Sequence, residues 1–195
     1  MTLRSAAVAV IAVCCALAVA GCGSSTSGSS AAIKRLRDKA HLDLCPTTDS
    51  SAASASHGLP NLTFGCLGNG PKVELSALRG APTLVNVWGS WCGPCQREVP
   101  ALQRIHADEG DKLRILGIDT EDSDASALDF AAHAGMTYPS VVDESGTFHR
   151  ALGRSTVPMT LYVDSDGELV HTSYGQFHGV EDIKSQVQQY LGVSL

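Results

Sequence analysis

Two cysteines, Cys92 and Cys95, are the residues whose types and spacing most directly predict chemistry in this chain. They follow an apolar run at 84–88 and stand where a helical pattern begins. The start of a helix favours negative charge, so a cysteine there is more often a thiolate, and the second thiol is close enough to form a disulfide. The pattern predicts a dithiol/disulfide redox pair. Cys92, at the helix start, is the expected nucleophile, and Cys95 is expected to resolve the mixed disulfide.

The elements that must position this pair alternate between strand and helix. A buried strand over 83–87 precedes the cysteines, and a helix over 92–107 follows, with Pro100 expected to kink it. Further strands are expected over 113–119, 138–142, 160–163 and 168–174, and further helices over 124–134, 148–152 and 183–191. An N-terminal hairpin over 62–67 and 72–75 comes before them. This order predicts an α/β domain with a mixed sheet.

Length and charge limit the possible functions. The chain has 195 residues, enough for one domain with its own core and an appendage. Its formal net charge of −6 argues against nucleic acid as the main partner. Beyond the N-terminal leader, no apolar run is long enough to span a membrane.

The leader predicts export. Residues 1–21 carry one basic residue, then a small apolar segment, and they end in Val-Ala-Gly before Cys22. This ending resembles a bacterial lipobox, in which the cysteine becomes the lipid-bearing first residue. The alternative is an ordinary signal peptide that leaves Cys22 free. Residues 22–30 are Ser/Gly-rich and predict a flexible tether. The protein is therefore expected at the cell membrane, lipid-anchored on its extracytoplasmic face.

Two cysteines remain outside the leader, the anchor position and the redox pair. With the redox cysteines paired by spacing, Cys45 and Cys66 are left as a structural disulfide, which export permits. Closing that loop would stabilise the fold by roughly 3 kcal/mol. Two alternatives stay open: both are buried free thiols, or one is a redox partner of the active pair.

Three motifs together carry a family resemblance: Val-Asn-Val-Trp-Gly-Ser-Trp-Cys-Gly-Pro-Cys at 85–95, Thr-Val-Pro-Met-Thr at 156–160 and Asp-x-Asp-Gly at 164–167. They resemble the thioredoxin superfamily and, within it, the exported TlpA/ResA-type oxidoreductases. The resemblance covers 59–195 and implies a thioredoxin-like fold, with a central mixed sheet flanked by helices and a helix-containing insertion at 121–154. Residues 31–58 form an N-terminal extension, and its Leu-Cys-Pro, together with Cys66, resembles actinobacterial lipoprotein members.

The resemblance also implies roles around the cysteines. Pro158 matches the family's cis-proline, which would turn the Val157 backbone toward a substrate peptide; a trans turn proline is the alternative. Trp91 is expected as an apolar platform beside the sulfur, or as simple packing. Glu98 matches an acidic position and would carry protons during exchange, unless it is a solvated helix carboxylate. Asn86 stands where thioredoxins have a buried aspartate, which leaves Glu98 as the candidate proton carrier.

The leading hypothesis is a thiol–disulfide oxidoreductase that needs no cofactor beyond its own Cys92–Cys95 disulfide. The resemblance implies protein disulfide substrates such as apocytochrome c in cytochrome c maturation, and a membrane electron donor of CcdA type. One alternative is an oxidase that forms disulfides in secreted proteins. Another is a non-enzymatic lipoprotein that binds a partner or a metal.

The remaining polar residues predict no second site. The seven histidines show no recognisable metal-ligand spacing, so no metal site is predicted. The acidic run at 119–124 is expected to be a solvated loop and helix cap.

Overall fold

The computed structural model describes residues 25–49 and 55–195. The chain divides into two units, residues 1–32 and 33–195. In the first unit, the described residues are the opening turns of helix α1 (Ser25–Ala40), which begins inside the segment expected to be a tether. The leader and Cys22 lie outside the described residues. Over the described ranges, no helix has both the length and the apolar character that a membrane crossing requires.

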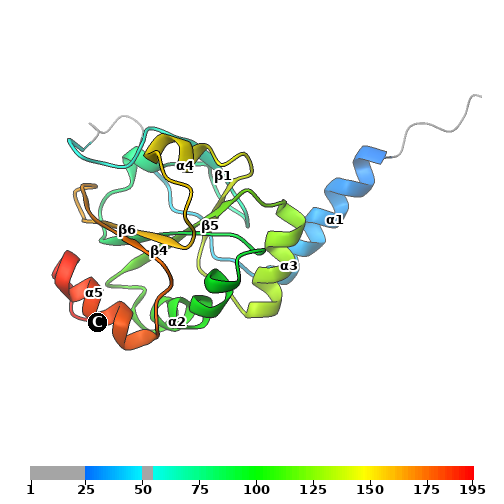
Figure 1. Cartoon of the computed structure of the whole chain (residues 1–195). Coiled ribbons are helices and arrows are strands. Elements are labelled where there is room, and N and C mark those ends of the chain that lie inside the picture. Colours follow the sequence, from blue (N-terminus) through cyan, green and yellow to red (C-terminus); the bar gives the residue numbers. More distant parts are fainter. Residues whose placement is uncertain (1–24, 50–54) are drawn as a thin grey trace, which may run out of the picture. The chain divides into compact units, whose positions relative to one another are not determined.

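A mixed sheet forms the centre of the second unit (Figure 1). Its strand order, in the part of the chain that the structure describes, is β2-β1-β5-β4-β3-β6-β7. The strands are β1 (Thr63–Cys66), β2 (Val73–Glu74), β3 (Thr83–Trp88), β4 (Arg114–Thr120), β5 (Ser140–Asp143), β6 (Met159–Val163) and β7 (Leu169–Tyr174). β4 runs parallel to both β3 and β5, and the other pairings are antiparallel. The prediction of an α/β domain with a mixed sheet is confirmed.

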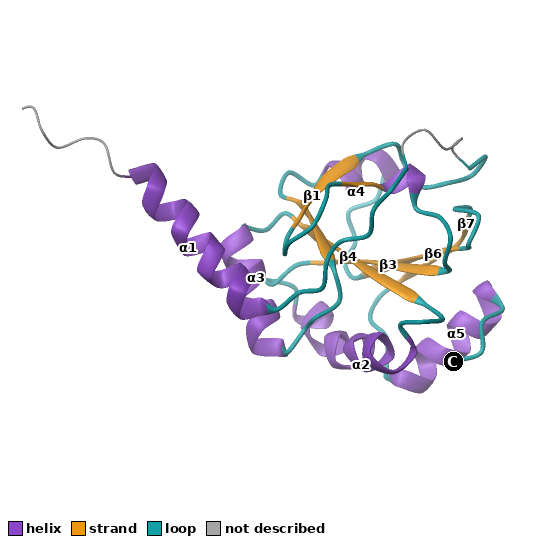
Figure 2. Ribbon diagram, turned by 180° about the vertical axis from the view of Figure 1, so that it is seen from behind, coloured by secondary structure: helices purple, strands orange, loops and turns teal. Residues whose placement is uncertain are grey.

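Helices cover both faces of this sheet (Figure 2). The bounds are α2 (Gly93–Glu109), α3 (Asp124–Ala134), α4 (Thr147–Leu152), α5 (Val180–Leu191) and a 3-10 turn η1 (Leu75–Ala77). Successive residues of β3 point to opposite faces. Leu84 and Trp88 join a core with α2, α3 and α5, whereas Val85 and Val87 join a second core with Phe148 of α4. Both faces of β3 are therefore buried, and this packing fixes the position of the turn that follows the strand.

Local signals explain where the flanking helices start and stop. Ser123 caps α3, since its hydroxyl oxygen accepts a hydrogen bond from the Ser126 N–H at 3.2 Å. The same helix ends at Gly135, whose φ of 64° is the left-handed conformation that glycine adopts most easily. The helix α2 runs continuously through Pro100.

The N-terminal extension is fastened to the sheet by a disulfide. Cys45 and Cys66 are bonded, with their Cα atoms 5.9 Å apart. Cys66 ends β1, which pairs with β2 as a hairpin and with β5 of the central sheet. The predicted structural disulfide is confirmed, so these cysteines are neither free thiols nor a partner of the redox pair.

Candidate active site

The redox pair lies at the start of α2, just after the turn that follows β3. Cys92 and Cys95 form a disulfide, with their Cα atoms 5.2 Å apart. Cys92 is the N-cap residue of α2, and its sulfur accepts a hydrogen bond from the Cys95 N–H at 3.2 Å. When the pair is reduced, the same N–H faces a thiolate at this position and stabilises its charge. Cys92 is 4% exposed and Cys95 is 0% exposed. This difference is in the direction expected for an attacking and a resolving cysteine.

The turn before Cys92 is fixed by contacts from three sides. The Trp91 indole N–H donates to the Thr120 carbonyl at 3.3 Å, and the Ser90 N–H donates to Asp122 Oδ2 at 2.7 Å. Gln96, one turn into α2, donates from its amide to the Ser90 carbonyl at 2.6 Å. Trp91 itself stays 53% exposed, so its ring forms a surface beside the disulfide.

Gly89 is required by the packing of that tryptophan. A Cβ atom at this position would lie 2.6 Å from Trp91 Nε1. No real carbon approaches so closely, so any side chain at residue 89 would displace the ring.

Glu98 is buried, at 1% exposure, which excludes the solvated helix carboxylate left open by the sequence. Asn86 of β3 donates from Nδ2 to Glu98 Oε1 at 2.8 Å, and the Phe177 N–H donates to Oε2 at 2.9 Å. Burial raises the pKa of Glu98 to about 7, against the opposing effect of these two hydrogen bonds. A buried carboxyl group three residues after Cys95 can therefore take or give a proton near neutral pH.

Pro158 stands at the same end of the sheet as the disulfide. The Val157–Pro158 peptide bond is cis, and the Pro158 carbonyl accepts from the Gly175 N–H at 3.0 Å. Met159, the next residue, pairs with Val87 in the antiparallel ladder of β6 and β3. Pro158 therefore lies opposite the end of β3, where the turn to the cysteines begins.

Asp119 was included in two sequence predictions, the strand over 113–119 and the solvated loop over 119–124. It belongs to β4, opposite Trp88 in the parallel register, and is 0% exposed. Burial raises its pKa to about 8, with further contributions from Asp122, Asp124 and Asp143. The strand predicted over 113–119 is therefore confirmed at Asp119, and the solvated loop predicted over 119–124 is wrong at its first two residues, because β4 continues to Thr120. Over the described ranges, no group of three or more His, Cys, Asp or Glu residues is arranged to hold a metal ion.

Several contacts of the site were missed at the sequence level. Phe177 contributes through a backbone N–H, which carries no residue-type signal. Asp122 and Gln96 were seen only as a loop residue and a helix residue, although both brace the turn at Ser90. The Asn86 side chain also donates to Thr160 Oγ1 at 3.2 Å, and this contact links β3 to β6.

Comparisons with known proteins agree with this geometry. Residues 22–188 match the Redoxin family. The thiol-disulfide oxidoreductase ResA of Geobacillus kaustophilus is 30% identical over 125 residues, which are 63% of this chain and 70% of that protein. A secreted thiol-disulfide isomerase from Corynebacterium glutamicum is 24% identical, with a TM-score of 0.58, over 77% of this chain and 96% of that one. A secreted Mycobacterium tuberculosis disulfide oxidoreductase is 18% identical, with a TM-score of 0.59, over 66% and 96%.

Proposed function

This chain belongs to the Redoxin family, and we propose that it reduces disulfide bonds of exported proteins through Cys92 and Cys95. Its thioredoxin-like fold and its ResA relatives make it a thiol–disulfide oxidoreductase, which removes the alternative of a non-enzymatic lipoprotein. The observation that carries the proposal is the disulfide at the start of α2, where the Cys92 sulfur accepts from a helix N–H.

The reaction begins from the reduced pair. The Cys92 thiolate attacks one sulfur of the substrate disulfide, forms a mixed disulfide and releases the other sulfur as a thiol. The Cys95 thiolate then attacks the Cys92 sulfur, so the Cys92–Cys95 bond forms and the second substrate thiol leaves. Two electrons pass from the enzyme to the substrate, and each released substrate sulfur takes up its proton from solvent.

Glu98 supplies the proton relay in this proposal. With a pKa of about 7, it can accept the Cys95 proton as that sulfur becomes the attacking thiolate, and return it when the pair is reduced again. The carboxyl and the thiols then titrate as a coupled set. The substitution Glu98→Gln tests the relay, because it should remove an inflection near pH 7 from the rate of exchange. An unchanged pH profile would return Glu98 to a structural role.

Substrate docking is assigned to Trp91, Val157 and Pro158. The exposed indole of Trp91 offers an apolar surface beside the attacking sulfur. Val157 lies two residues before β6, so its backbone can pair with an extended substrate segment as an added strand. Such backbone pairing accepts many sequences, which suits an enzyme whose substrates are unfolded polypeptides.

Location and partners follow from the leader and from the family resemblance. Residues 1–21 would be removed as a lipoprotein signal peptide, and an acylated Cys22 would hold the domain at the outer face of the cytoplasmic membrane through the tether at 22–30. The proposed substrate there is the oxidised Cys-x-x-Cys-His segment of apocytochrome c, and the proposed electron donor is a CcdA-type membrane protein. The substitution Cys22→Ala should release the protein from membranes, and unchanged retention would refute the anchor.

The decisive measurement for direction is the reduction potential of the Cys92–Cys95 pair. A value near about −270 mV favours reduction of substrates, and a value near about −120 mV favours the alternative of disulfide formation in secreted proteins. The substrate is identified with Cys95→Ser, which cannot resolve the mixed disulfide and so keeps its partner bound. Recovery of apocytochrome c from cells supports the proposed substrate, and recovery of other secreted proteins alone contradicts it.

A further inference from the structure

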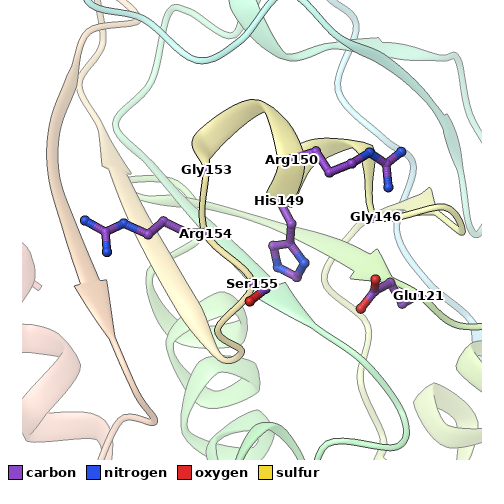
Figure 3. Close-up of a pocket in the computed structure, with 7 residues that line it drawn as sticks. All are labelled: Glu121, Gly146, His149, Arg150, Gly153, Arg154 and Ser155. Atoms are coloured by element: carbon purple, nitrogen blue, oxygen red, sulfur yellow. The ribbon is translucent and has the colours of Figure 1, made fainter.

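A pocket lies on the α4 side of the sheet, away from α2. It encloses about 390 Å³. Figure 3 shows its lining residues, which lie just after β4, in α4 and at its N-cap, and in the segment that leads to Pro158: Glu121, Gly146, His149, Arg150, Gly153, Arg154 and Ser155. Neither the redox reaction nor the sequence motifs account for these residues.

His149 gives this pocket an unsatisfied polar group. The residue is only 4% exposed, and both ring nitrogens are buried without a hydrogen-bond partner among the described residues. Figure 3 shows the imidazole directed into the space between Ser155 and Glu121. A buried polar group without a hydrogen-bond partner destabilises the fold, and a ligand that bonds to it removes that destabilisation.

The charges around His149 are unevenly placed. Arg150 is held by neutral acceptors, the Ser145 carbonyl at 2.6 Å and Thr147 Oγ1 at 3.2 Å, so its positive charge is not neutralised. Arg154 lies over the ring of Tyr174, 5.8 Å from the ring centroid, with no carboxylate partner in the described ranges. The lining residues include two arginines and one glutamate, so the pocket has a net charge of +1, although the net charge of the whole chain is −6.

Glu121 occupies the opposite end from Arg154 (Figure 3). Its φ of 52° is in the left-handed region, and its carboxylate lies against Gly146, where a Cβ atom would come within 2.9 Å of Oε1. This carboxylate repels an anion at its own end of the pocket. Ser155 and the base of Arg154 form the other end, and Figure 3 shows the Arg154 guanidinium extending away from His149, where it lies over the Tyr174 ring. Its positive charge attracts an anion at this end when the side chain turns toward the pocket.

Residues on both sides of the pocket are close in sequence to residues of the redox site. Glu121 lies between Thr120, whose carbonyl accepts from the Trp91 indole, and Asp122, which accepts from the Ser90 N–H. Ser155 lies three residues before Pro158 on the opposite wall. A polypeptide docked across Trp91 and Pro158 therefore passes this pocket with residues close to its reacting cysteine.

We infer that this pocket binds a carboxylate side chain of the substrate polypeptide near the cysteine under attack. His149 and Ser155 hold the carboxylate, and Arg154 joins them by turning from the Tyr174 ring toward the pocket. The inference rests on the proposed function, because it assigns a specificity pocket to that same reaction. It predicts that aspartate or glutamate close to the substrate cysteine accelerates exchange.

The test uses the full chain in its reduced form and three synthetic peptide disulfides. Each peptide has one cysteine and is joined to a second copy of itself, and the three differ only in whether the flanking residues are aspartate, asparagine or lysine. The second-order rate constant for release of peptide thiols is measured in a single turnover. Comparing the aspartate-to-asparagine ratio between variants cancels the intrinsic reactivity of each peptide.

Arg154→Gln should lower this ratio by on the order of tenfold, because one charge-assisted contact is lost. Arg104→Gln is the matched control, since Arg104 is exposed on α2 and pairs with Asp108, and it should leave the ratio at the wild-type value. His149→Phe keeps a ring and removes its nitrogens, and it should lower the ratio in the same direction. Arg154→Glu should make the lysine peptide the fastest of the three.

A ratio that is equal in Arg154→Gln and Arg104→Gln overturns the carboxylate pocket while leaving the proposed reductase intact. A wild-type preference for the lysine peptide also overturns it, and assigns the pocket to Glu121 instead. A reduced wild-type chain that releases thiol from none of the peptides is a different result, because it refutes the proposed reductase and this inference together.

Discussion

The two disulfides of this protein are the same bond in two different settings. Cys92 and Cys95 are three residues apart at a helix start, with a helix N–H donated to one sulfur and a buried carboxyl group on the next turn. Cys45 and Cys66 are 21 residues apart and join the N-terminal extension to a strand near the sheet edge. We propose that the first setting stabilises a thiolate and supplies a proton carrier, whereas the second closes a loop. The surroundings, rather than the bond, separate a redox centre from a structural cross-link.

The largest expected difference is in turnover. Cys92→Ser should reduce the rate of disulfide reduction by roughly three orders of magnitude or more, since no other group can form the mixed disulfide. The double substitution Cys45→Ser with Cys66→Ser should keep turnover within a few-fold of the wild type. Insulin reduction, followed by turbidity, measures both. Comparable losses in the two variants would break the distinction between the disulfides.

Stability should show the opposite pattern. Loss of the Cys45–Cys66 bond should lower the free energy of unfolding by roughly 3 kcal/mol, because the unfolded chain regains the freedom of the closed loop. Urea unfolding of the oxidised protein measures this loss, with Cys45→Ala and Cys66→Ala combined. Opening the three-residue Cys92–Cys95 loop should cost less, and the reverse order would contradict the assignment.

The pH dependence of stability should reveal the buried carboxyl group beside the redox pair. Since the pKa of Glu98 is raised to about 7, the folded state binds more protons than the unfolded state between about pH 4.5 and 7. Its contribution to stability is therefore complete at low pH and is lost as the pH rises through 7. The free energy of unfolding should therefore fall less between pH 4.5 and 8 in Glu98→Gln than in the wild type, by about 3 kcal/mol.

Asp119 provides an internal reference for that experiment. Its pKa is also raised, to about 8, so Asp119 lowers the free energy of unfolding with rising pH in the wild type and in Glu98→Gln alike. The difference between wild type and Glu98→Gln therefore isolates Glu98. Identical pH dependence of urea unfolding in the two proteins would show that Glu98 ionises at its ordinary pKa.

The smallest expected effect is a shift in the pH midpoint of exchange. Asn86→Ala removes a hydrogen bond that lowers the pKa of Glu98, so the midpoint should move upward by about one pH unit. Thr160→Val is the matched control, because it removes the other acceptor of Asn86 and leaves the bond to Glu98. Single-turnover rates from pH 5 to 9 measure the midpoint. A downward shift would contradict the role of Asn86.

Local sequence was enough to predict the centre of the site. The apolar strand, the Cys-Gly-Pro-Cys turn and the helix after it are contiguous, so short-range patterns determine their geometry. The helix over 124–134 was predicted with the bounds that the structure has, and in the structure a serine cap and a terminal glycine mark its two ends. The Cys45–Cys66 pairing followed because the other two cysteines were already committed by their spacing.

Long-range contacts account for what the sequence did not reveal. The burial of Glu98 depends on a backbone N–H from Phe177, which lies 79 residues away and has no side-chain signature for this role. The pocket around His149 is assembled from three separate segments, none of which is unusual by itself.

Residues 175–177 offer a direct spectroscopic use of the fold. The Gly175 N–H bonds to the Pro158 carbonyl, and the Phe177 N–H bonds to the Glu98 carboxyl. In an NMR spectrum of labelled protein, the Phe177 amide shift should follow ionisation of the carboxyl group, and the Gly175 amide shift should follow any displacement of Pro158. Two resonances from neighbouring parts of one loop would then record proton transfer and peptide occupancy separately in a single sample.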